Sequence, residues 1–351
     1  MPRESGGSRR RTLQDVAETV GLSVNTVSRA LRDLPGVGDA TRAQIKAEAE
    51  RIGYVPNAHA RSLVLGSRKT IGVIITDLAN PFFNDLVSEI EEQAIQAGYT
   101  LVLLLSDEDP EREQVAVDTA LRSGVDGIIA VPVQGRSNPW VAVTRAGVPL
   151  VLVAREMPGL DVDFFSSDNQ AGRRQTTETM ISLGAQDIIL LEEDLRISTV
   201  SHRLDGFRAA LEAHGIEYDS RRTAVVPSRR TARGASLWRG EDAYLVASDL
   251  LESGRVPDGI LVGNDFFALG VYAALRERGI RVGKDTMIMG WGDYPFSRYL
   301  DPPLSTVRLP VIEVARRATT RMLSLLDGTA TLDPIAEYIQ PEIMLRASTN
   351  H

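Results

Sequence analysis

Apolar residues near the start of the chain recur at the spacing of a short amphipathic helix. The positions i, i+3, i+4 and i+7 are held by Leu13, Val16, Ala17 and Val20. Thr12 stands before this series and Asp15 three positions later, which is the spacing of a capping box. Gly21 follows, and glycine readily adopts the left-handed conformation that ends a helix. The pattern therefore predicts a short helix that begins after Thr12.

Two more helices are predicted in the same region. Ser23 can cap a second helix, whose inward positions are Val27, Ala30 and Leu31. A third apolar series runs from about Asp39 to Ile52 and stops at Gly53. Two short helices joined by a turn that contains glycine are typical of a helix-turn-helix. We expect residues 1–53 to form an all-α head, ordered from about residue 11.

From Thr70 onward, flat apolar runs alternate with helical patterns. The runs are Ile71–Thr76, Leu101–Ser106, Gly127–Val131, Pro149–Ala154, Asp187–Leu191, Gly259–Gly263 and Met287–Trp291. Their apolar and polar residues do not alternate, which predicts strands buried on both faces in helix-covered parallel sheets. The length of 70–351 favours two doubly wound α/β halves with a cleft between them. In such sheets ligands bind beyond the carboxyl ends of the strands.

Charge is divided unevenly along the chain. Residues 1–70 hold 12 Lys and Arg against 7 Asp and Glu, a net charge of +5. The rest of the chain holds 27 basic and 40 acidic residues, a net charge of −13. A small basic head on a large acidic body indicates that only the head contacts a polyanion.

The second predicted helix directs Val24, Asn25, Ser28 and Arg29 away from its apolar face. Asn and Arg side chains form paired hydrogen bonds with adenine and guanine in the major groove. Ser, Thr and helix N-termini suit phosphates. The alternative is a helical hairpin whose polar face contacts only water. The positive charge of the first 70 residues favours DNA.

A short segment follows the third predicted helix. Pro56 prevents that helix from continuing, and Asn57 can cap a further turn from Ala58 to Leu63. About six residues are too few for a stable isolated helix in water. The segment is therefore either a linker or a helix that forms only against a partner.

These features together resemble the lactose/galactose repressor (LacI/GalR) family of bacterial transcription regulators. The resemblance is carried by Thr12–Asp33, by Tyr54-Val55-Pro56-Asn57 and by Ala60-Arg61-Ser62-Leu63. It implies that residues 54–69 are a hinge helix and linker, which folds in the minor groove as a dimer pair and wedges Leu63 into a base step. A packing role for Leu63 is the alternative. The residues that the resemblance and the helix pattern assign to DNA are Thr12, Leu13, Ser23, Val24, Asn25, Thr26, Ser28, Arg29, Tyr54, Asn57, Ala60 and Leu63.

The resemblance extends over nearly the whole body. Its further signatures are Asp77–Phe83, Ser166–Gly172, His202–Leu211, Val262–Gly270 and Pro302–Arg308. The family body resembles periplasmic sugar-binding proteins. We therefore expect residues 70–351 to bind an effector and to dimerise. The implied N-subdomain is 70–166 plus 294–328, and the implied C-subdomain is 167–293 plus 329–351.

The resemblance also implies an effector cleft between the subdomains. The residues that it places there are Phe82, Phe83, Arg155, Arg203, Asn264, Trp291 and Asp293. The phenylalanines would offer apolar faces to a ring, Arg203 would be a charged clamp, and Asn264 would bond hydroxyls. The alternatives are a core role for the phenylalanines and a surface role for Arg203. Asp265, beside Asn264, is expected to be a structural helix cap.

The sequence departs from the family at two places in this cleft. Gly292 stands where an acid commonly contacts the ligand, and Glu192–Asp194 stand where small residues are usual. An arginine without a nearby acid favours a ligand with its own negative charge, because a buried unpaired guanidinium is costly. We therefore expect a phosphorylated or acidic sugar-like effector, unless Asp293 or Glu192–Asp194 supply the acid.

Composition bounds the remaining classes. The chain has no cysteine, which excludes a disulfide scaffold, a thiol nucleophile and thiolate metal sites. No apolar run reaches the roughly 18 residues of a membrane span, and MPRESGGSRRR lacks the apolar segment of a secretory signal, so a cytoplasmic protein is expected. The four histidines form no HExxH, and no nucleophile elbow or phosphate loop occurs. We expect no enzyme activity, metal or cofactor.

The expected function is a ligand-responsive, sequence-specific transcription regulator, with a repressor favoured, that binds a near-palindromic operator as a homodimer. Effector binding in the cleft would shift the N-subdomains and thereby change the hinge helices. The rival is a solute-binding receptor of the periplasmic type without a regulatory role. It would fit the body, but it needs a signal peptide and no basic head.

Overall fold

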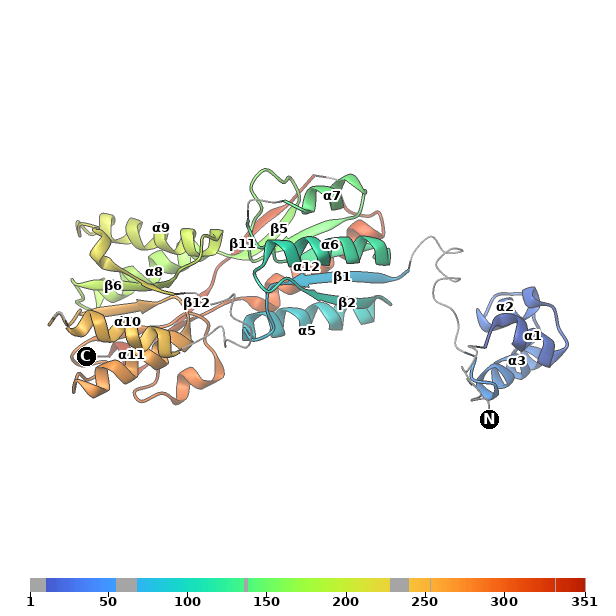
Figure 1. Cartoon of the computed structure of the whole chain (residues 1–351), viewed down its shortest axis with the longest axis horizontal. Helices are drawn as coiled ribbons and strands as arrows, with labels where there is room; N and C mark the ends of the chain where they lie inside the picture. The colour runs from blue at the N-terminus through green and yellow to red at the C-terminus, as the bar shows by residue number, and fades with distance from the viewer. Residues whose placement is uncertain are drawn as a thin grey trace, which may run out of the picture. The chain divides into compact units, whose positions relative to one another are not determined.

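The computed structural model describes residues 11–54, 68–135, 138–227, 240–252, 254–331 and 333–350. The chain divides into two compact units, Met1–Arg68 and Lys69–His351. The blue helices in Figure 1 belong to the first unit, the head, and the cyan-to-red elements belong to the second, the body. Each unit has its own hydrophobic core.

The head consists of α1 (Leu13–Val20), α2 (Val24–Leu31) and α3 (Asp39–Arg51). The expected capping box is present, since Thr12 Oγ1 accepts the Asp15 N–H and the Asp15 carboxylate accepts the Thr12 N–H at 2.6 Å. Gly21 ends α1 with a φ of 65°, in the left-handed region. The buried core of the head is Val16, Ala17, Val27, Ala30, Ile45 and Ala49. The predicted helix-turn-helix is confirmed.

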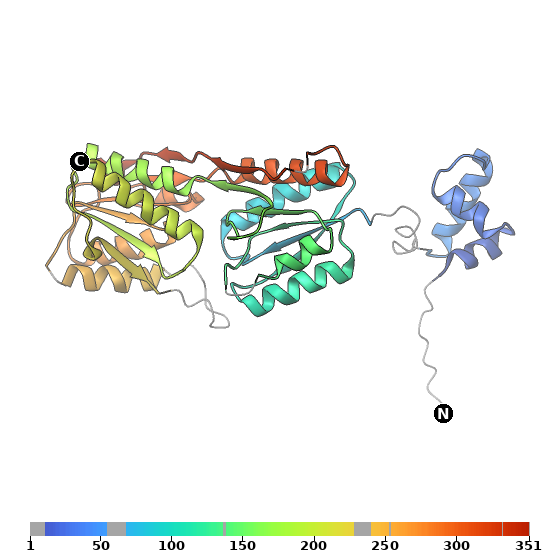
Figure 2. The same cartoon turned by 90° about the horizontal axis from the view of Figure 1, so that it is seen from above.

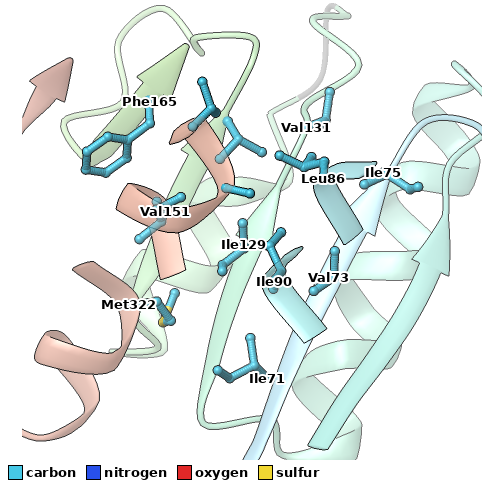
Figure 3. Close-up of a cluster of buried hydrophobic side chains, with 14 of the residues drawn as sticks. Ile71, Val73, Ile75, Leu86, Ile90, Ile129, Val131, Val151, Phe165 and Met322 are labelled. Atoms are coloured by element: carbon cyan, nitrogen blue, oxygen red, sulfur yellow. The ribbon is translucent and has the colours of Figure 1, made fainter. Parts of the chain in front are cut away.

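The first half of the body is a six-stranded parallel sheet with the order β11-β5-β4-β3-β1-β2. Its strands are β1 (Thr70–Ile75), β2 (Thr100–Leu105), β3 (Gly127–Ala130), β4 (Leu150–Val153), β5 (Asp163–Ser167) and β11 (Ala336–Ile339). Helices α5 (Pro81–Gln96) and α12 (Val311–Leu326) cover one face, and α6 (Pro110–Ser123) and α7 (Trp140–Arg145) cover the other. In Figure 3, Ile71 and Val73 of β1 lie in one core with Leu86 and Ile90 of α5 and Met322 of α12.

The second half is a four-stranded parallel sheet with the order β7-β6-β8-β9. Its strands are β6 (Ile188–Glu193), β7 (Thr223–Val226), β8 (Gly259–Val262) and β9 (Met287–Met289). Helices α8 (Asn169–Ser182) and α9 (Ser198–Ala213) cover one face, and α10 (Gly240–Glu252) and α11 (Asp265–Glu277) cover the other. Short 3-10 helices occupy Ser220–Arg222, Pro295–Tyr299 and Ala347–Thr349. The predicted class, two doubly wound α/β halves with parallel sheets, is confirmed.

An antiparallel pair, β10 (Thr306–Arg308) with β12 (Glu342–Met344), lies beside β9 through bridges at Ser305 and Arg308. The chain therefore passes between the halves three times, after β5, after β10 and after β11. Figure 2 shows the red C-terminal segment running along both halves.

Two of the predicted subdomain segments are wrong. Residues 294–309 belong to the second half and not to the N-subdomain segment 294–328, because Ser305 bridges to Met289 of β9 and Arg308 bridges to Gly292 just after it. Strand β11 belongs to the first half and not to the C-subdomain segment 329–351, because it pairs in parallel with β5 from Ala336↔Phe164 to Ile339↔Ser167. β11 alternates exposed and half-buried residues, so it has no flat apolar run to reveal it.

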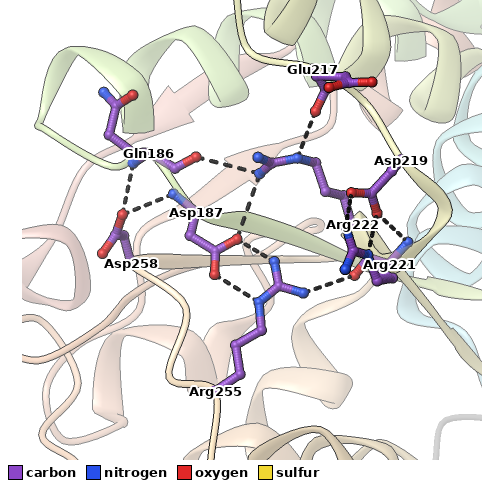
Figure 4. A network of polar contacts seen from close by, with 8 residues as sticks. All are labelled: Gln186, Asp187, Glu217, Asp219, Arg221, Arg222, Arg255 and Asp258. Carbon is purple, nitrogen blue, oxygen red and sulfur yellow. Dashed lines mark hydrogen bonds and ion pairs between the residues drawn. The ribbon is translucent and has the colours of Figure 1, made fainter.

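A polar network fixes the beginnings of two neighbouring strands in the second half (Figure 4). The Asp187 carboxylate, before β6, accepts a hydrogen bond from Arg255 Nε at 2.8 Å and lies 3.6 Å from Arg222 Nη1. Asp258 Oδ2, before β8, accepts the N–H groups of Gln186 and Asp187, each at 2.8 Å. The two carboxylates thereby hold β6 and β8 in register at the edge opposite to their carboxyl ends.

Asp187→Asn is expected to lower the free energy of unfolding by about 1 kcal/mol at neutral pH, since the pair is partly exposed. The hydrogen bond from Arg255 lowers the pKa of the Asp187 carboxyl. A lowered native pKa stabilises the fold above the unfolded pKa, and this stabilisation is lost as the pH falls through the native value. The difference between wild type and variant should therefore shrink below about pH 4. Thermal unfolding of both proteins from pH 7 to pH 3 measures it, and a difference independent of pH would contradict it.

Candidate functional site

The exposed face of α2 carries the side chains predicted to contact DNA. Val24 and Asn25 are exposed in its first turn, and Val24 is 39% exposed although it is apolar. Ser23 caps the helix, since its Oγ accepts the Thr26 N–H at 3.1 Å and lies 2.8 Å from Thr26 Oγ1. Ser28, one turn after Val24, is half-buried. The beginning of α2 thus presents an apolar contact, an amide and hydroxyls.

Other residues predicted to contact DNA are engaged within the head itself. Arg29 donates through Nη2 to the Pro35 carbonyl, and it lies against Gly36, where a Cβ would be 3.0 Å from Nη2. Leu13 and Tyr54 are half-buried and pack against the head core. Leu13 and Tyr54 therefore belong to the packing of the head. Arg29 lies one turn after Asn25 on α2, and its guanidinium is engaged by the Pro35 carbonyl.

The positive charge of the head lies mostly outside its three helices. Residues 11–54 carry six basic and six acidic side chains, so the net +5 of residues 1–70 comes from the segments on either side. The predicted hinge helix and its residues Asn57, Ala60 and Leu63 lie outside the described residues. Shape and hydrogen bonding, more than charge, distinguish the exposed face of α2.

A cleft between the two halves of the body lies at the carboxyl ends of their strands, as expected for doubly wound sheets. The predicted residues that line it are Phe82, Phe83, Arg155, Arg203, Asn264 and Trp291. The other lining residues are Asn80, Ala154, Ser166, Ser167, Asn169, Glu193, Ile197, Thr199, Gly263, Tyr294 and Leu309. The structure thus brings together all the predicted effector residues except Asp293.

Tyr294 joins the two walls of the cleft and is not predicted from the sequence. Its hydroxyl donates to Asn80 Oδ1 at 3.0 Å and accepts from Asn264 Nδ2 at 3.3 Å. Asn80 caps α5 through the Phe82 N–H, and Asn264 caps α11 through the Phe266 N–H. Burial raises the pKa of the Tyr294 hydroxyl, which stays protonated and able to donate. The shared pattern Asn-X-Phe is the sequence signal that could have paired the two caps.

Asp265 fixes the loop that carries Tyr294. Its fully buried carboxylate accepts hydrogen bonds from Thr306 Oγ1 at 2.6 Å, from Ser297 Oγ at 2.7 Å and from the Tyr294 N–H at 3.0 Å. Its own N–H donates to the Trp291 carbonyl at 3.1 Å. The prediction that Asp265 is a helix cap is wrong, because Asn264 caps α11. The role of Asp265 is structural in another way, since its carboxylate holds the loop that carries Tyr294.

Arg203 is buried in the cleft wall and is paired with an acid. Its Nε and Nη2 donate to the two oxygens of Glu192 at 2.8 and 2.7 Å. Although burial opposes it, the charge of Arg203 lowers the pKa of Glu192, so both groups stay ionised. The guanidinium also lies 5.5 Å from the centroid of the Trp291 ring.

The expectation of an acidic or phosphorylated effector assumed that Arg203 has no acid beside it. That assumption is wrong, because Glu192 turns inward and forms the bidentate pair. Arg155 is also paired, since its Nη1 and Nη2 donate to the oxygens of Glu108 at 2.8 and 2.6 Å. Each arginine in the wall is thus neutralised by a carboxylate from its own half of the body.

Asp293 turns away from the cleft, so the prediction that it contacts the effector is wrong for this structure. Its buried carboxylate pairs with Arg346 and accepts from Arg308 Nε at 2.9 Å. Gly292 has a φ of 138°, and a Cβ there would lie 2.9 Å from the Tyr294 ring. The space left by the glycine is therefore occupied by this ring.

The cleft has the chemistry of a binding site. Its wall offers aromatic faces, amides, hydroxyls and paired ions, and its lining residues include no histidine. Within the described ranges, no group of three His, Asp or Glu side chains could hold a metal ion. Nor is any helix of that part of the chain both long and apolar enough to cross a membrane.

Two family models match the two units of the chain. A model described as bacterial regulatory proteins of the lacI family matches residues 12–57. A model described as periplasmic binding proteins and sugar binding domain of LacI family matches residues 68–318, which is more than half of the chain. The second match begins at residue 68, where the structure divides the head from the body.

Characterised proteins resemble the chain over almost its whole length. The HTH-type transcriptional regulator DegA of Bacillus subtilis (strain 168) is 28% identical over 97% of this chain and 98% of its own. The ribose operon repressor of Escherichia coli (strain K12) is 28% identical over 96% and 99%. The structure of the Lac repressor dimer bound to operator and the anti-inducer ONPF matches with a TM-score of 0.84, at 26% identity over 98% and 100%. With a capped helix-turn-helix, a two-half body and both family models in the same order, the chain belongs to the LacI family of bacterial regulatory proteins.

Proposed function

We propose that the protein is a transcription repressor that binds a near-palindromic operator as a homodimer and responds to a small sugar-like effector. The observation that carries this is the presence, in one chain, of an α2 that exposes Asn25 and of a cleft lined by rings and amides. The full-length match to the ribose operon repressor, and to a Lac repressor dimer bound to operator, supports it. Operator DNA lies in the cytoplasm, where we propose that the protein acts without catalysing a reaction.

The effector changes the affinity for DNA by changing how the two halves of the body are positioned relative to each other. Polar contacts join these halves in the described part of the chain. The Gln134 amide donates to Ser198 Oγ at 3.0 Å and accepts the Ser198 N–H at 2.7 Å. Tyr294 bridges the walls inside the cleft. A ligand hydroxyl that bonds Asn80 and Asn264 in place of the Tyr294 hydroxyl would break this bridge. A ligand shifts the equilibrium between two arrangements of a protein by the difference in its affinity for them.

The proposal is tested with a duplex that carries an inverted repeat found beside the protein's own gene. The full chain is expected to bind this duplex at least about a thousandfold more tightly than a scrambled duplex at the same salt concentration. A mobility-shift titration measures both affinities, with and without a panel of sugars. Equal affinity for the two duplexes would show that the protein does not recognise a sequence.

Asn25→Ala and Arg29→Ala are expected to have different effects. Asn25 is exposed on α2, so its loss should relax the base preference at one position of each half-site by about 1–3 kcal/mol. Arg29 is bonded to the Pro35 carbonyl, so its loss should lower the thermal stability of the head and leave the preference unchanged. Titration of singly substituted operators measures this, with the exposed amide Gln44→Ala as control. If Arg29→Ala relaxes the preference instead, the guanidinium leaves Pro35 when DNA binds.

Tyr294→Phe is expected to weaken the contact between the two halves of the body. The change keeps the ring and removes the hydroxyl that joins Asn80 and Asn264. Loss of the bridge should favour separation of the two cleft walls by about 1 kcal/mol, roughly fivefold in the equilibrium. Hydrogen exchange of the first turns of α5 and α11 should become faster. Tyr299→Phe, at a residue that is 81% exposed, is the control, and unchanged exchange in Tyr294→Phe would show that the bridge does not hold the cleft.

A further inference from the structure

We propose that Glu192 restricts the cleft to effectors without negative charge, so that the ligand class is a neutral polyhydroxylated molecule. This inference rests on the proposed function of the cleft as the effector site. It makes Glu192 a specificity-determining residue that acts through Arg203.

Glu192 occupies a niche that the fold builds for a carboxylate. The residue lies near the carboxyl end of β6 and is 3% exposed. Gly263 follows the neighbouring strand β8, and a Cβ there would lie 2.1 Å from Glu192 Oε1. The glycine therefore leaves the space that the carboxylate needs. The same oxygen accepts the Glu193 N–H at 3.1 Å, which fixes the orientation of the side chain further.

The pair uses the donors with which Arg203 could hold an anion. Nε and Nη2 form the planar fork that an arginine offers to a phosphate or a carboxylate, and both donate to Glu192. An anionic ligand would have to displace Glu192 from its niche or approach a guanidinium already neutralised beside it. Both bury a negative charge in a cleft whose lining arginines, Arg155 and Arg203, are already paired with carboxylates.

A second guanidinium increases the importance of Glu192. Arg173 is fully buried, lies 4.5 Å from the centroid of the Trp291 ring and donates from Nη2 to the Val262 carbonyl at 3.0 Å. Among the described residues its Nε and Nη1 have no hydrogen-bond acceptor. Burial lowers the pKa of Arg173 to about 9, and the charge of Glu192 opposes this shift. Without Glu192, Arg173 and Arg203 would be two neighbouring buried cations.

The rest of the described wall adds no cation without a carboxylate beside it. Arg155 is paired with Glu108, and Glu193 adds a carboxylate to the lining. The Asn80 and Asn264 amides, which now bond the Tyr294 hydroxyl, suit ligand hydroxyls, and Phe82 offers a ring face. A neutral ligand with several hydroxyls gains these contacts without burying an unpaired charge.

The test replaces Glu192 by glutamine and uses sulfate as the probe. Sodium sulfate at millimolar concentration is compared with sodium chloride at equal ionic strength, by thermal unfolding of the full chain. Wild type should show no saturable stabilisation by sulfate. Glu192→Gln should gain one, with an apparent Kd at least about tenfold lower than any value for wild type, because the Arg203 fork is released. Glu178→Gln, which breaks the more exposed pair with Arg174, is the matched control and should behave like wild type.

Two results would overturn the inference. One is a saturable stabilisation of wild type by sulfate that Arg203→Gln abolishes. The other is a folded Glu192→Gln protein that shows no saturable stabilisation by sulfate. If Glu192→Gln does not fold, the double variant Arg173→Met, Glu192→Gln replaces it, because only Arg203 is then uncompensated. Operator binding by the same samples without sulfate tests the proposed function separately. A failure of the sulfate experiment is therefore distinguished from a failure of the proposed function.

Discussion

Removal of residues 1–68 is expected to abolish specific operator binding and to leave a folded body. The cut falls where the structure divides the chain, one residue before Lys69, whose Nζ donates to the Tyr99 hydroxyl at 3.0 Å within the body. The cores of the body contain no residue of the head. The residues after position 70 carry a net charge of −13, which repels DNA. The affinity for operator should therefore fall by about a thousandfold or more, the usual margin of specific over non-specific binding.

Mobility shift with operator and scrambled duplexes measures this loss, and circular dichroism and sedimentation check that the body is folded and dimeric. A chain that lacks only residues 1–10 is the control, because it keeps α1, α2 and α3. It should retain base preference while its affinity depends less on salt, since the removed segment holds three arginines and one glutamate. Specific binding by residues 69–351 would contradict the division of labour between head and body.

Asp265→Ala is expected to lower the free energy of unfolding of the body by about 3–5 kcal/mol. The reason is that it leaves the Ser297 and Thr306 hydroxyls and the Tyr294 N–H buried without their acceptor. Denaturant unfolding of the full chain measures this change. The loop that presents Tyr294 and Trp291 should loosen at the same time, which faster hydrogen exchange of residues 291–297 would show.

Asp265→Asn separates the charge from the hydrogen bonds, because the amide keeps the shape and one of the two acceptors. We expect it to lose less than half as much stability as Asp265→Ala. Asp249→Ala, at an exposed carboxylate of α10, is the control and should change stability by less than about 0.5 kcal/mol. If Asp265→Ala is as stable as this control, the Ser297 and Thr306 hydroxyls find other acceptors and Asp265 does not hold the loop.

The helices and strands that can be predicted from the sequence are those marked by residues within the element itself, such as caps and apolar runs. The head follows from the caps at Thr12 and Ser23 and from apolar positions at helical spacing, and the structure has its helices within a residue of the expected bounds. Strands such as β1 and β8 follow from flat apolar runs, because a strand covered on both faces needs apolar residues at every position. Strands β7 and β11 have no such run, and only their pairing reveals them.

The sequence predicts most of the residues that line the cleft, but it does not predict which of their charged groups are paired. Six of the seven residues expected there line it, because each matches a family position. Whether Arg203 is paired, and whether Asp293 points inward, depends on partners far away in the sequence. Glu192 needs the space beside Gly263, and Asp293 is held by Arg308 and Arg346. Such partners follow from tertiary packing, which a motif does not contain.

The three passages of the chain between the halves have a consequence for its synthesis. The helices of the head are synthesised before any strand of the body. The first half of the body lacks its edge strand until β11 is synthesised, and the second half lacks β12 until shortly after that. Domains generally fold as units, N-terminal first, as the chain emerges. A chain interrupted before β11 would thus carry a finished helix-turn-helix on a body with unpaired strand edges at β5 and β10, the kind of surface that promotes aggregation. Because each half is completed by a strand near the C-terminus, only a fully translated chain forms a stable body and therefore a stable regulator.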